Sequence, residues 1–292
     1  MTDLLFRDDA YLTEVSARVL AITPEGGIVP DRTVFYATGG GQPGDSGWLA
    51  WDGGRIAIAT ALKVAGGVAL IPAEPAALPP VGAEVTQHLD WQRRHRHMRV
   101  HTALHLLSVV IPLPVTGGAI GDGRGRLDFD MPDPPEDVAA LEAALNRLIE
   151  RDLPVTTDWI TDAELAANPG LVKTLSVAPP VGQGRVRLVR IGQGDMQVDL
   201  QPCGGTHVAA TGDIGLVRIV SDSAVAAGVR RIEALTGEAA RRHLDEQDRR
   251  LKAVAAALKV GPGEVLARVE SLVDERRRME RELAEARRKL AM

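Results

Sequence analysis

Hydrophobic and polar positions alternate in short runs through residues 1–89, and glycine and proline separate the runs. Residues 15–22 largely alternate and are followed by a Pro-Glu-Gly-Gly turn at 24–27, which predicts a strand and its end. The same pattern predicts further strands at 33–36, 47–49, 55–59, 67–71 and 83–89. Short strands at this spacing are typical of a small barrel. We therefore expect a β-barrel domain over residues 1–89.

The pattern changes to a helical period at residue 90. Asp90 is a candidate N-cap for a helix over 91–110 that ends before Pro112. A second helix is expected over 134–151, where apolar residues recur at helical spacing. A glycine-rich turn at 117–121 and strands at 126–130, around Trp159, at 186–191 and at 215–220 complete this part. The mixture predicts an α+β fold, with an α/β two-layer domain over 90–238 whose helices pack on an antiparallel sheet.

From residue 239 the chain is expected to be helical and is highly charged. Leu244, Leu251 and Leu258 recur every seven residues before a Gly-Pro-Gly break at 261–263. In the helix that follows, two apolar rows have the same period, with Arg276 interrupting: Val265, Leu272, Met279 and Ala286, and Val269, Leu283 and Leu290. These rows predict a helical coiled-coil tail over 239–292. The seam could join two chains as a homodimer through residues 240–290, or fold back as a hairpin on its own domain.

Composition narrows the class of protein. A chain of 292 residues is expected to form two or three domains, and 45% hydrophobic with 25% charged residues is ordinary for a globular protein. No apolar run approaches the roughly 20 residues that span a bilayer, and the N-terminus lacks a signal-peptide pattern. One cysteine excludes an internal disulfide, so a cytoplasmic location is expected. The net charge of −5 argues against non-specific coating of nucleic acid but allows a local basic surface.

Two motifs each place two metal-ligand side chains four residues apart. His101 and His105 lie in the expected 91–110 helix, where positions i and i+4 share one face. Cys203 and His207 flank a Gly-Gly pair that disfavours a helix, so this stretch is expected to be a loop that folds back. Three imidazoles and a thiolate suit Zn²⁺ better than Mg²⁺ or Ca²⁺. Each motif alone is weak, but together they predict one zinc ion per chain.

Two further features have alternative interpretations. The triple glycine at 39–41 either brings the backbone of Gly40 and Gly41 close to a ligand or the neighbouring domain, or forms a bulged turn in the barrel. It lacks the ending of a phosphate-binding loop, which argues against nucleotide binding. The 91–110 helix carries four arginines before its histidines, which either receive a phosphodiester backbone or form a solvent-facing turn: Arg93, Arg94, Arg96 and Arg99.

Several motifs together carry a resemblance to a known family. HTALH at 101–105, CGGTHV at 203–208, TGDIG at 211–215 and AGVRRIE at 227–233 resemble the editing domain of alanyl-tRNA synthetase, which threonyl-tRNA synthetase shares. The stretch from Phe35-Tyr36 to Gln42-Pro43-Gly44 resembles the glycine-rich motif of the preceding barrel. With no room for an aminoacylation domain before it, the chain resembles the freestanding AlaX family of alanyl-tRNA editing proteins.

The resemblance implies an activity and a ligand set. It implies hydrolysis in trans of tRNA(Ala) mischarged with serine, with glycine as a second candidate, and His101, His105, Cys203 and His207 as zinc ligands. At two pocket positions the chain departs from the synthetase pattern, with Leu104 in place of threonine and Thr116-Gly117-Gly118 in place of glutamine. Both departures concern the preference between serine and glycine.

Selection against alanine requires a partner for the hydroxyl of serine, because a polar group left unpaired by alanine discriminates strongly. Candidate partners are Thr102, Thr116 and Thr206. Arg230 is a candidate for the terminal ribose-phosphate, with an interdomain ion pair as the alternative. Asp199 and Gln201 are either orienting partners of the metal ligands or ordinary strand residues.

Two other functions fit the same residues. The chain could be a zinc-stabilised tRNA-binding module that dimerises without turnover. Alternatively, Cys203 could be a nucleophile activated by a nearby histidine. A binder would protect a mischarged ester, an editor would release many equivalents of amino acid, and a thiol enzyme would work without zinc.

Overall fold

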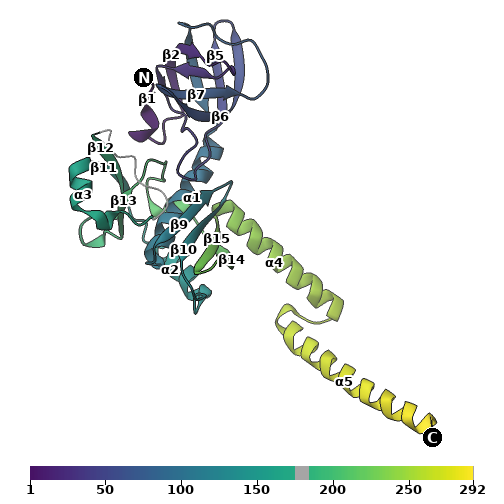
Figure 1. Cartoon of the computed structure of the whole chain (residues 1–292). Coiled ribbons are helices and arrows are strands. Elements are labelled where there is room, and N and C mark those ends of the chain that lie inside the picture. The colour runs from purple at the N-terminus through teal and green to yellow at the C-terminus, as the bar shows by residue number, and fades with distance from the viewer. Residues whose placement is uncertain (175–183, 292) are drawn as a thin grey trace. The chain divides into compact units, whose positions relative to one another are not determined.

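The computed structural model describes residues 1–174 and 184–291, which form two compact units, Met1–Ala240 and Arg241–Met292 (Figure 1). The first unit contains a barrel, a four-stranded sheet with two helices and a three-stranded sheet. The second contains helix only. Within the described residues, no helix combines the length and apolarity required to span a membrane.

The expected N-terminal barrel is confirmed and is closed by six strands. In order around the barrel they are β2 (Glu14–Ile22), β3 (Ile28–Pro30), β7 (Gly67–Pro72), β6 (Gly54–Val64), β5 (Gly47–Trp51) and β8 (Glu84–Leu89). Alternate residues fill the interior, among them Val19, Leu49, Ile58 and Leu70, which are almost fully buried. A short parallel pair, β1 (Asp3–Leu4) and β4 (Arg32–Thr33), lies outside it, with the 3₁₀ turn η1 (Leu5–Arg7) after β1.

The strand expected at 33–36 is largely wrong, because regular pairing ends at Thr33. The next residues are apolar and buried, but side chains satisfy their backbone in place of a neighbouring strand. Gln87 Oε1 accepts from the Val34 N–H (3.4 Å), and the Asp45 carboxylate accepts from the Tyr36 N–H (2.6 Å). The hydrophobic pattern therefore predicted the burial of residues 34–36 correctly, but it predicted their strand pairing wrongly.

Helix α1 (Trp91–Val110) follows the barrel and has the predicted bounds. Asp90 caps it, accepting from the Arg93 N–H (3.1 Å). The helix packs on an antiparallel sheet whose strand order is β14 (Val217–Ala226), β15 (Val229–Thr236), β10 (Arg124–Asp130) and β9 (Val115–Ile120). Helix α2 (Val138–Glu150) contacts α1 and β14. The turn expected at 117–121 is wrong, since most of it is strand β9.

The three-stranded antiparallel sheet has the order β11 (Val155–Thr161), β12 (Arg185–Ile191) and β13 (Asp199–Pro202). The chain around it forms α3 (Asp162–Ala167) and the 3₁₀ turns η2 (Pro169–Leu171), η3 (Gly194–Met196) and η4 (Thr211–Ile214). Strand β13 ends directly before Cys203, and residues 203–210 return to pair with the start of β11. This sheet therefore delivers the cysteine to the region of α1.

The predicted C-terminal helices are confirmed as α4 (Gly237–Leu258) and α5 (Val265–Leu290), with the turn η5 (Pro262–Glu264) between them. Pairs of opposite charge one turn apart lie along both, as between Arg250 and Glu246 (2.9 Å). Apolar residues of the expected seam are largely exposed, for example Leu251 (44%), Met279 (57%) and Leu283 (52%).

Candidate metal centre

Helix α1 presents His101 and His105 on the same face, one turn apart. Their ring centroids lie 5.3 Å from each other, and both side chains are buried. Ala103, Leu104, Leu106 and Leu107 in this part of the helix are good helix formers, and its apolar residues pack into the core of the sheet domain. Two imidazoles are thus fixed before any ligand arrives.

The loop after β13 brings the second pair to the same place. Arg187 on β12 donates to the carbonyl oxygens of Cys203 (3.1 Å) and Gly205 (2.9 Å), which holds the loop in its folded-back form. A Cβ at Gly205 would lie 2.2 Å from Cε1 of His101, so only glycine allows the loop to approach the ring. The Gly-Gly pair excluded a helix in the sequence, and here it permits close contact.

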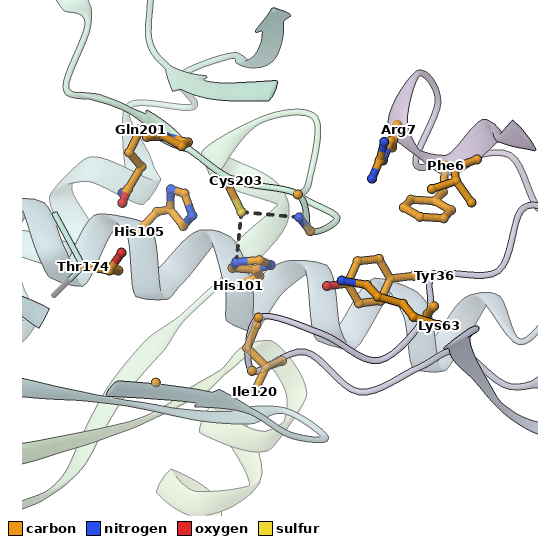
Figure 2. Close-up of a pocket in the computed structure, with 18 of the residues that line it drawn as sticks. Phe6, Arg7, Tyr36, Lys63, His101, His105, Ile120, Thr174, Gln201 and Cys203 are labelled. Atoms are coloured by element: carbon orange, nitrogen blue, oxygen red, sulfur yellow. Dashed lines mark hydrogen bonds between the residues drawn. The ribbon is translucent and has the colours of Figure 1, made fainter. Parts of the chain in front are cut away.

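The four predicted ligand side chains converge on one point. One ligand atom from each of His101, His105, Cys203 and His207 lies within 4.8 Å of the other three. The Cys203 sulfur is 3.4 Å from Nε2 of His101 (Figure 2). It is 3.3 Å from Nε2 of His207. This group could hold a metal ion, and its three nitrogens and one sulfur are a donor set suited to zinc.

Each histidine is also held by its other ring nitrogen. His101 Nδ1 donates to Gln42 Oε1 (3.0 Å), and His105 Nδ1 donates to Asp199 Oδ2 (3.0 Å). His207 Nδ1 lies 3.1 Å from the Thr102 hydroxyl. When Nδ1 carries the proton, the Nε2 lone pair is free, which is the arrangement usual for metal-binding histidines.

Protonation states at the cluster agree with this interpretation. Burial alone would raise the pKa of the Cys203 thiol, but His101 and His207 outweigh it and hold that pKa well below its usual value. Burial, with His101 beside it, keeps the pKa of His207 well below its usual value. Thiolate and neutral imidazole are the forms that bind metals. For His105, burial lowers the pKa but Asp199 and Cys203 raise it to about 9, so metal binding there displaces a proton.

A cavity of about 730 Å³ opens onto the cluster, a size typical of small-molecule sites. Its wall includes His101, His105 and Cys203, together with Leu104 and two glycines of the barrel, Gly40 and Gly41. In Figure 2, α1 runs across the middle of the view, with the Cys203 loop above it and Ile120 below it. The candidate metal ligands His101, His105 and Cys203 are therefore reachable by a small molecule.

The glycine-rich loop of the barrel reaches into the sheet domain. Gly39 and Gln42 close it by two backbone hydrogen bonds (3.1 and 3.0 Å), and Gly41 has a left-handed φ of 78°. The Gly41 carbonyl accepts from the Ile120 N–H of β9 (2.8 Å), and a Cβ at Gly41 would lie 2.8 Å from a β9 carbonyl. The loop thus approaches the neighbouring sheet closely, and its Gln42 side chain enters the buried space beside His101.

The predicted threonines do not line the cavity. Thr102 accepts from the Val208 N–H (3.2 Å), Thr206 accepts from Gln42 Nε2 (2.8 Å), and Thr116 donates to the Asp128 carbonyl (3.1 Å). The hydroxyls of Thr102 and Thr206 thus bond to groups around the candidate metal ligands, and the hydroxyl of Thr116 bonds within the sheet. Among the predicted substrate contacts, the structure places Leu104, Gly40 and Gly41 in the cavity wall.

Two sets of predicted arginine contacts lie elsewhere. Arg230 pairs with Asp222 across the β14–β15 ladder (2.9 Å) and is not in the cavity wall. Arg94 requires a correction: it is fully buried and ion-paired with Asp45 of the barrel, so it cannot contact RNA. Its Nη2 also donates to the Val34 carbonyl (2.6 Å). The sequence suggested that Arg94 is exposed, but its side chain is buried, and a buried charge must be paired.

Three of the important contacts were not predicted from sequence. Gln42 and two rim residues, Arg7 and Lys63, lie in the barrel or its N-terminal segment, far from either motif in the chain. The only available signal was the glycine-rich motif itself, which placed Gln42 beside a close approach. Asp199, an open choice in the sequence, contacts His105 directly.

Comparisons with known proteins agree with this architecture. The model for the threonyl and alanyl tRNA synthetase second additional domain matches residues 186–233, and the model for class II (A) tRNA synthetases matches residues 9–93. Among curated proteins, the chain is 41% identical over 280 residues to an alanine–tRNA ligase of Mesorhizobium japonicum, covering 91% of this chain and 31% of that protein. A ligase of the same name from Rhizobium meliloti is 38% identical over 302 residues, covering 94% of this chain and 34% of the relative. The chain thus spans about a third of the length of the curated relatives it matches.

Proposed function

Because the chain carries an editing domain like that of alanyl-tRNA synthetases, we propose that it is an aminoacyl-tRNA deacylase. Its substrate would be tRNA(Ala) mischarged with serine, with glycine as a second candidate, and it would act in trans in the manner of freestanding editing proteins. The observation that carries the proposal is the convergence of four ligand atoms within 4.8 Å beside a cavity. An aminoacyl ester is easily hydrolysed, so a single metal centre is sufficient to catalyse the reaction.

We propose zinc as the resident metal, held by His101, His105, Cys203 and His207. The donor set fits, since the thiolate and the free Nε2 atoms face one another while the Nδ1 atoms are used elsewhere. When bound, such an ion supplies Lewis-acid polarisation of an ester carbonyl or of water. The residues of the chain do the rest: they hold the rings in one tautomer, exclude bulk water and position the ester.

The shape of the cavity supports a small amino acid beside the cluster. Leu104 contributes an apolar part of the wall, and Gly117 and Gly118 on β9 line the cavity without side chains. Next to His105, Gln201 also lines the cavity, with its Nε2 donating to Asp199 (2.8 Å). This contact leaves Gln201 Oε1 as an acceptor for the hydroxyl of serine, which alanine would leave unpaired. Gln201→Leu should therefore lower the rate on Ser-tRNA(Ala) more than on Gly-tRNA(Ala), and equal losses on both would reject this role.

The test is a deacylation panel with Ser-, Gly- and Ala-tRNA(Ala), with and without a chelator. A deacylase at catalytic concentration releases many equivalents of serine, spares Ala-tRNA(Ala) and loses activity on chelation. Protection of the ester without release would favour the tRNA-binding module instead. Full activity without metal would favour Cys203 as a nucleophile.

We also propose that α4 and α5 form a coiled-coil contact between two chains. The exposed apolar residues of the seam, with ion pairs on either side, support association, because such residues gain free energy when covered. Sedimentation of the full chain should give a dimer, and the double substitution Leu251→Arg with Leu283→Arg should give a monomer. A monomeric wild-type chain would favour the hairpin alternative.

A further inference from the structure

Besides Lys173, three cationic side chains line the cavity. They are Arg7 on η1, Lys63 on β6 and Arg185 at the start of β12. Figure 2 shows Arg7 and Lys63 with Tyr36 on one side of the space, across from His105 and Gln201. The same cavity therefore has a metal-ligand end and a cationic end.

Each cation is held in position by the fold. The Arg7 carbonyl accepts from Arg187 Nε (3.2 Å), the residue that also fixes the Cys203 loop. Lys63 lies over the glycine-rich loop, where a Cβ at Gly39 would be 2.8 Å from its Nζ. The Arg185 guanidinium stacks on the Trp159 ring, 4.3 Å from its centroid.

These charges are not neutralised within the protein. In the described part of the chain, Arg7, Lys63 and Arg185 form no ion pair, and residues 175–183 contain no acidic side chain. Lys173, which also lines the cavity, differs because it pairs with Asp199. Partial burial and the positive charge of Arg185 lower the pKa of Arg7, a cost to the charged form that an anion would relieve.

Two acidic side chains also line the cavity, but they do not neutralise the three cations. Asp3 and Asp8 line the same end of the cavity, and neither is in ion-pair contact with the three cations. The wall therefore has an excess of positive charge, concentrated on three separate segments. Phosphates are recognised by such convergent Arg and Lys side chains, and the exposed face of a stacked guanidinium also accepts a nucleobase.

We propose that Arg7, Lys63 and Arg185 form an anion subsite that binds the phosphodiester groups of the RNA 3′ end while the aminoacyl ester reaches the metal ligands. This inference rests on the proposed deacylase function and adds where the nucleic acid lies. It replaces the arginines of α1 as the contact surface, since those side chains are occupied by internal partners. The ligand chemistry is a phosphodiester backbone followed by a terminal adenosine.

The test compares two esters of different length on the full chain. Ser-tRNA(Ala) carries the phosphates, whereas 2′(3′)-O-seryl-adenosine presents the same ester without them. Arg7→Gln, Lys63→Gln and Arg185→Gln should each lower kcat/KM on the tRNA roughly fivefold at moderate salt and reduce the salt slope of binding by about 1. The rate on seryl-adenosine should stay at the wild-type value.

Two control variants make the comparison directional. Asp8→Asn removes a nearby negative charge and should strengthen tRNA binding, opposite to the effect of Arg7→Gln. Arg96→Gln removes a positive charge from α1, where Arg96 pairs with Asp122, and should change neither substrate. Equal losses on both esters, or no loss on the tRNA, would overturn the subsite.

Failure of the two proposals can be separated. If the wild-type chain hydrolyses neither ester, the deacylase function fails, and the subsite is judged by binding of an uncharged RNA hairpin ending in CCA. If the subsite exists, the RNA hairpin will bind more weakly to the three variants. Inorganic phosphate at constant ionic strength will not displace the RNA from the wild-type chain. Displacement of the RNA by inorganic phosphate would instead assign a site for the free anion and overturn the proposal.

Discussion

The two halves of helix α1 use polar side chains in opposite ways. In the N-terminal half, the arginines are engaged inside the protein: Arg94 pairs with Asp45, Arg96 pairs with Asp122, and Arg99 donates to the Asp213 carbonyl (2.6 Å). In the C-terminal half, His101 and His105 are each held through Nδ1 by Gln42 or Asp199, while their ligand atoms lie close to those of Cys203 and His207. The first half joins the helix to its surroundings, and the second keeps a free ligand atom for chemistry.

This difference separates structural from functional polar residues better than sequence clustering does. A run of arginines next to a histidine motif suggested RNA binding, yet each of its charges has an internal partner or carbonyl acceptor. Among the described residues, the cations of the cavity wall that form no ion pair come from segments far apart in the chain, such as Arg7 and Arg185. A charged side chain without a partner beside a cavity is a stronger indication of a binding site, because a ligand can supply the missing partner.

The largest expected effect is in the second half of α1. His101→Ala should abolish bound zinc and reduce deacylation of Ser-tRNA(Ala) to the uncatalysed level, because several kcal/mol of transition-state stabilisation depend on the ion. Metal analysis and single-turnover assays measure both. His95→Ala, also on α1 but stacked on Trp91, is the matched control and should keep metal and activity. Wild-type activity in His101→Ala would remove the metal from the mechanism.

The first half should respond in stability. Arg94→Met leaves the buried Asp45 carboxylate without its partner and should lower the free energy of unfolding by about 3–5 kcal/mol. The double variant Arg94→Met with Asp45→Asn should recover part of this loss, since the asparagine can still accept from the Tyr36 N–H. Denaturant unfolding measures both. A cost below about 1 kcal/mol for the single variant would place Arg94 outside the buried ion pair.

A buried histidine in the N-terminal half, His97, should make the stability depend on pH. Burial, with Arg93 adding to it, lowers the pKa of His97 to about 4, so the unfolded chain takes up this proton first as pH falls. The free energy of unfolding should therefore decrease between about pH 6.5 and pH 4, by up to about 3 kcal/mol from this group, and be unaffected by it at higher pH. His97→Gln removes the dependence, so the stability difference between variant and wild type should change across that window. A difference that is constant with pH would contradict the assignment.

Features of the fold that depend on local sequence were predicted better than features that depend on distant contacts. Local period and capping gave α1 with its bounds and most barrel strands, because these depend on neighbours in sequence. The buried segment Val34–Tyr36 and the strand β9 were missed, since glycine content and apolar runs do not reveal whether side chains or strands satisfy the backbone. The seam on α4 and α5 was visible as periodicity, but the sequence does not state what covers it.

For the site, chemistry was more predictable than support. Four metal-ligand residues stood out by type and spacing, and the structure brings them together. Their orienting partners are ordinary residues such as Gln42 and Thr102, which have no distinguishing pattern. They are brought to the ligands only by the docking of a barrel loop and a helix turn.

The smallest expected effect concerns that support. Gln42→Ala removes the acceptor of His101 Nδ1 and should weaken metal affinity about 10- to 100-fold. Gln42→Glu keeps an acceptor oxygen and should restore most of the affinity. Ser46→Ala is the control, because it removes a hydrogen bond from the Ser46 hydroxyl to Asp90 (3.4 Å) without touching a ligand or the ligand loop. Equal affinity in Gln42→Ala and wild type would show that the barrel does not position His101.

The most direct test of the central claim is a titration of the apoprotein with Co²⁺, followed by absorption spectroscopy. If His101, His105, Cys203 and His207 hold one ion, the full chain will bind one cobalt per molecule with a sulfur-to-cobalt charge-transfer band. Cys203→Ser will lose that band, and zinc will displace the cobalt. Binding without a thiolate band, or no stoichiometric binding at all, would contradict the metal centre.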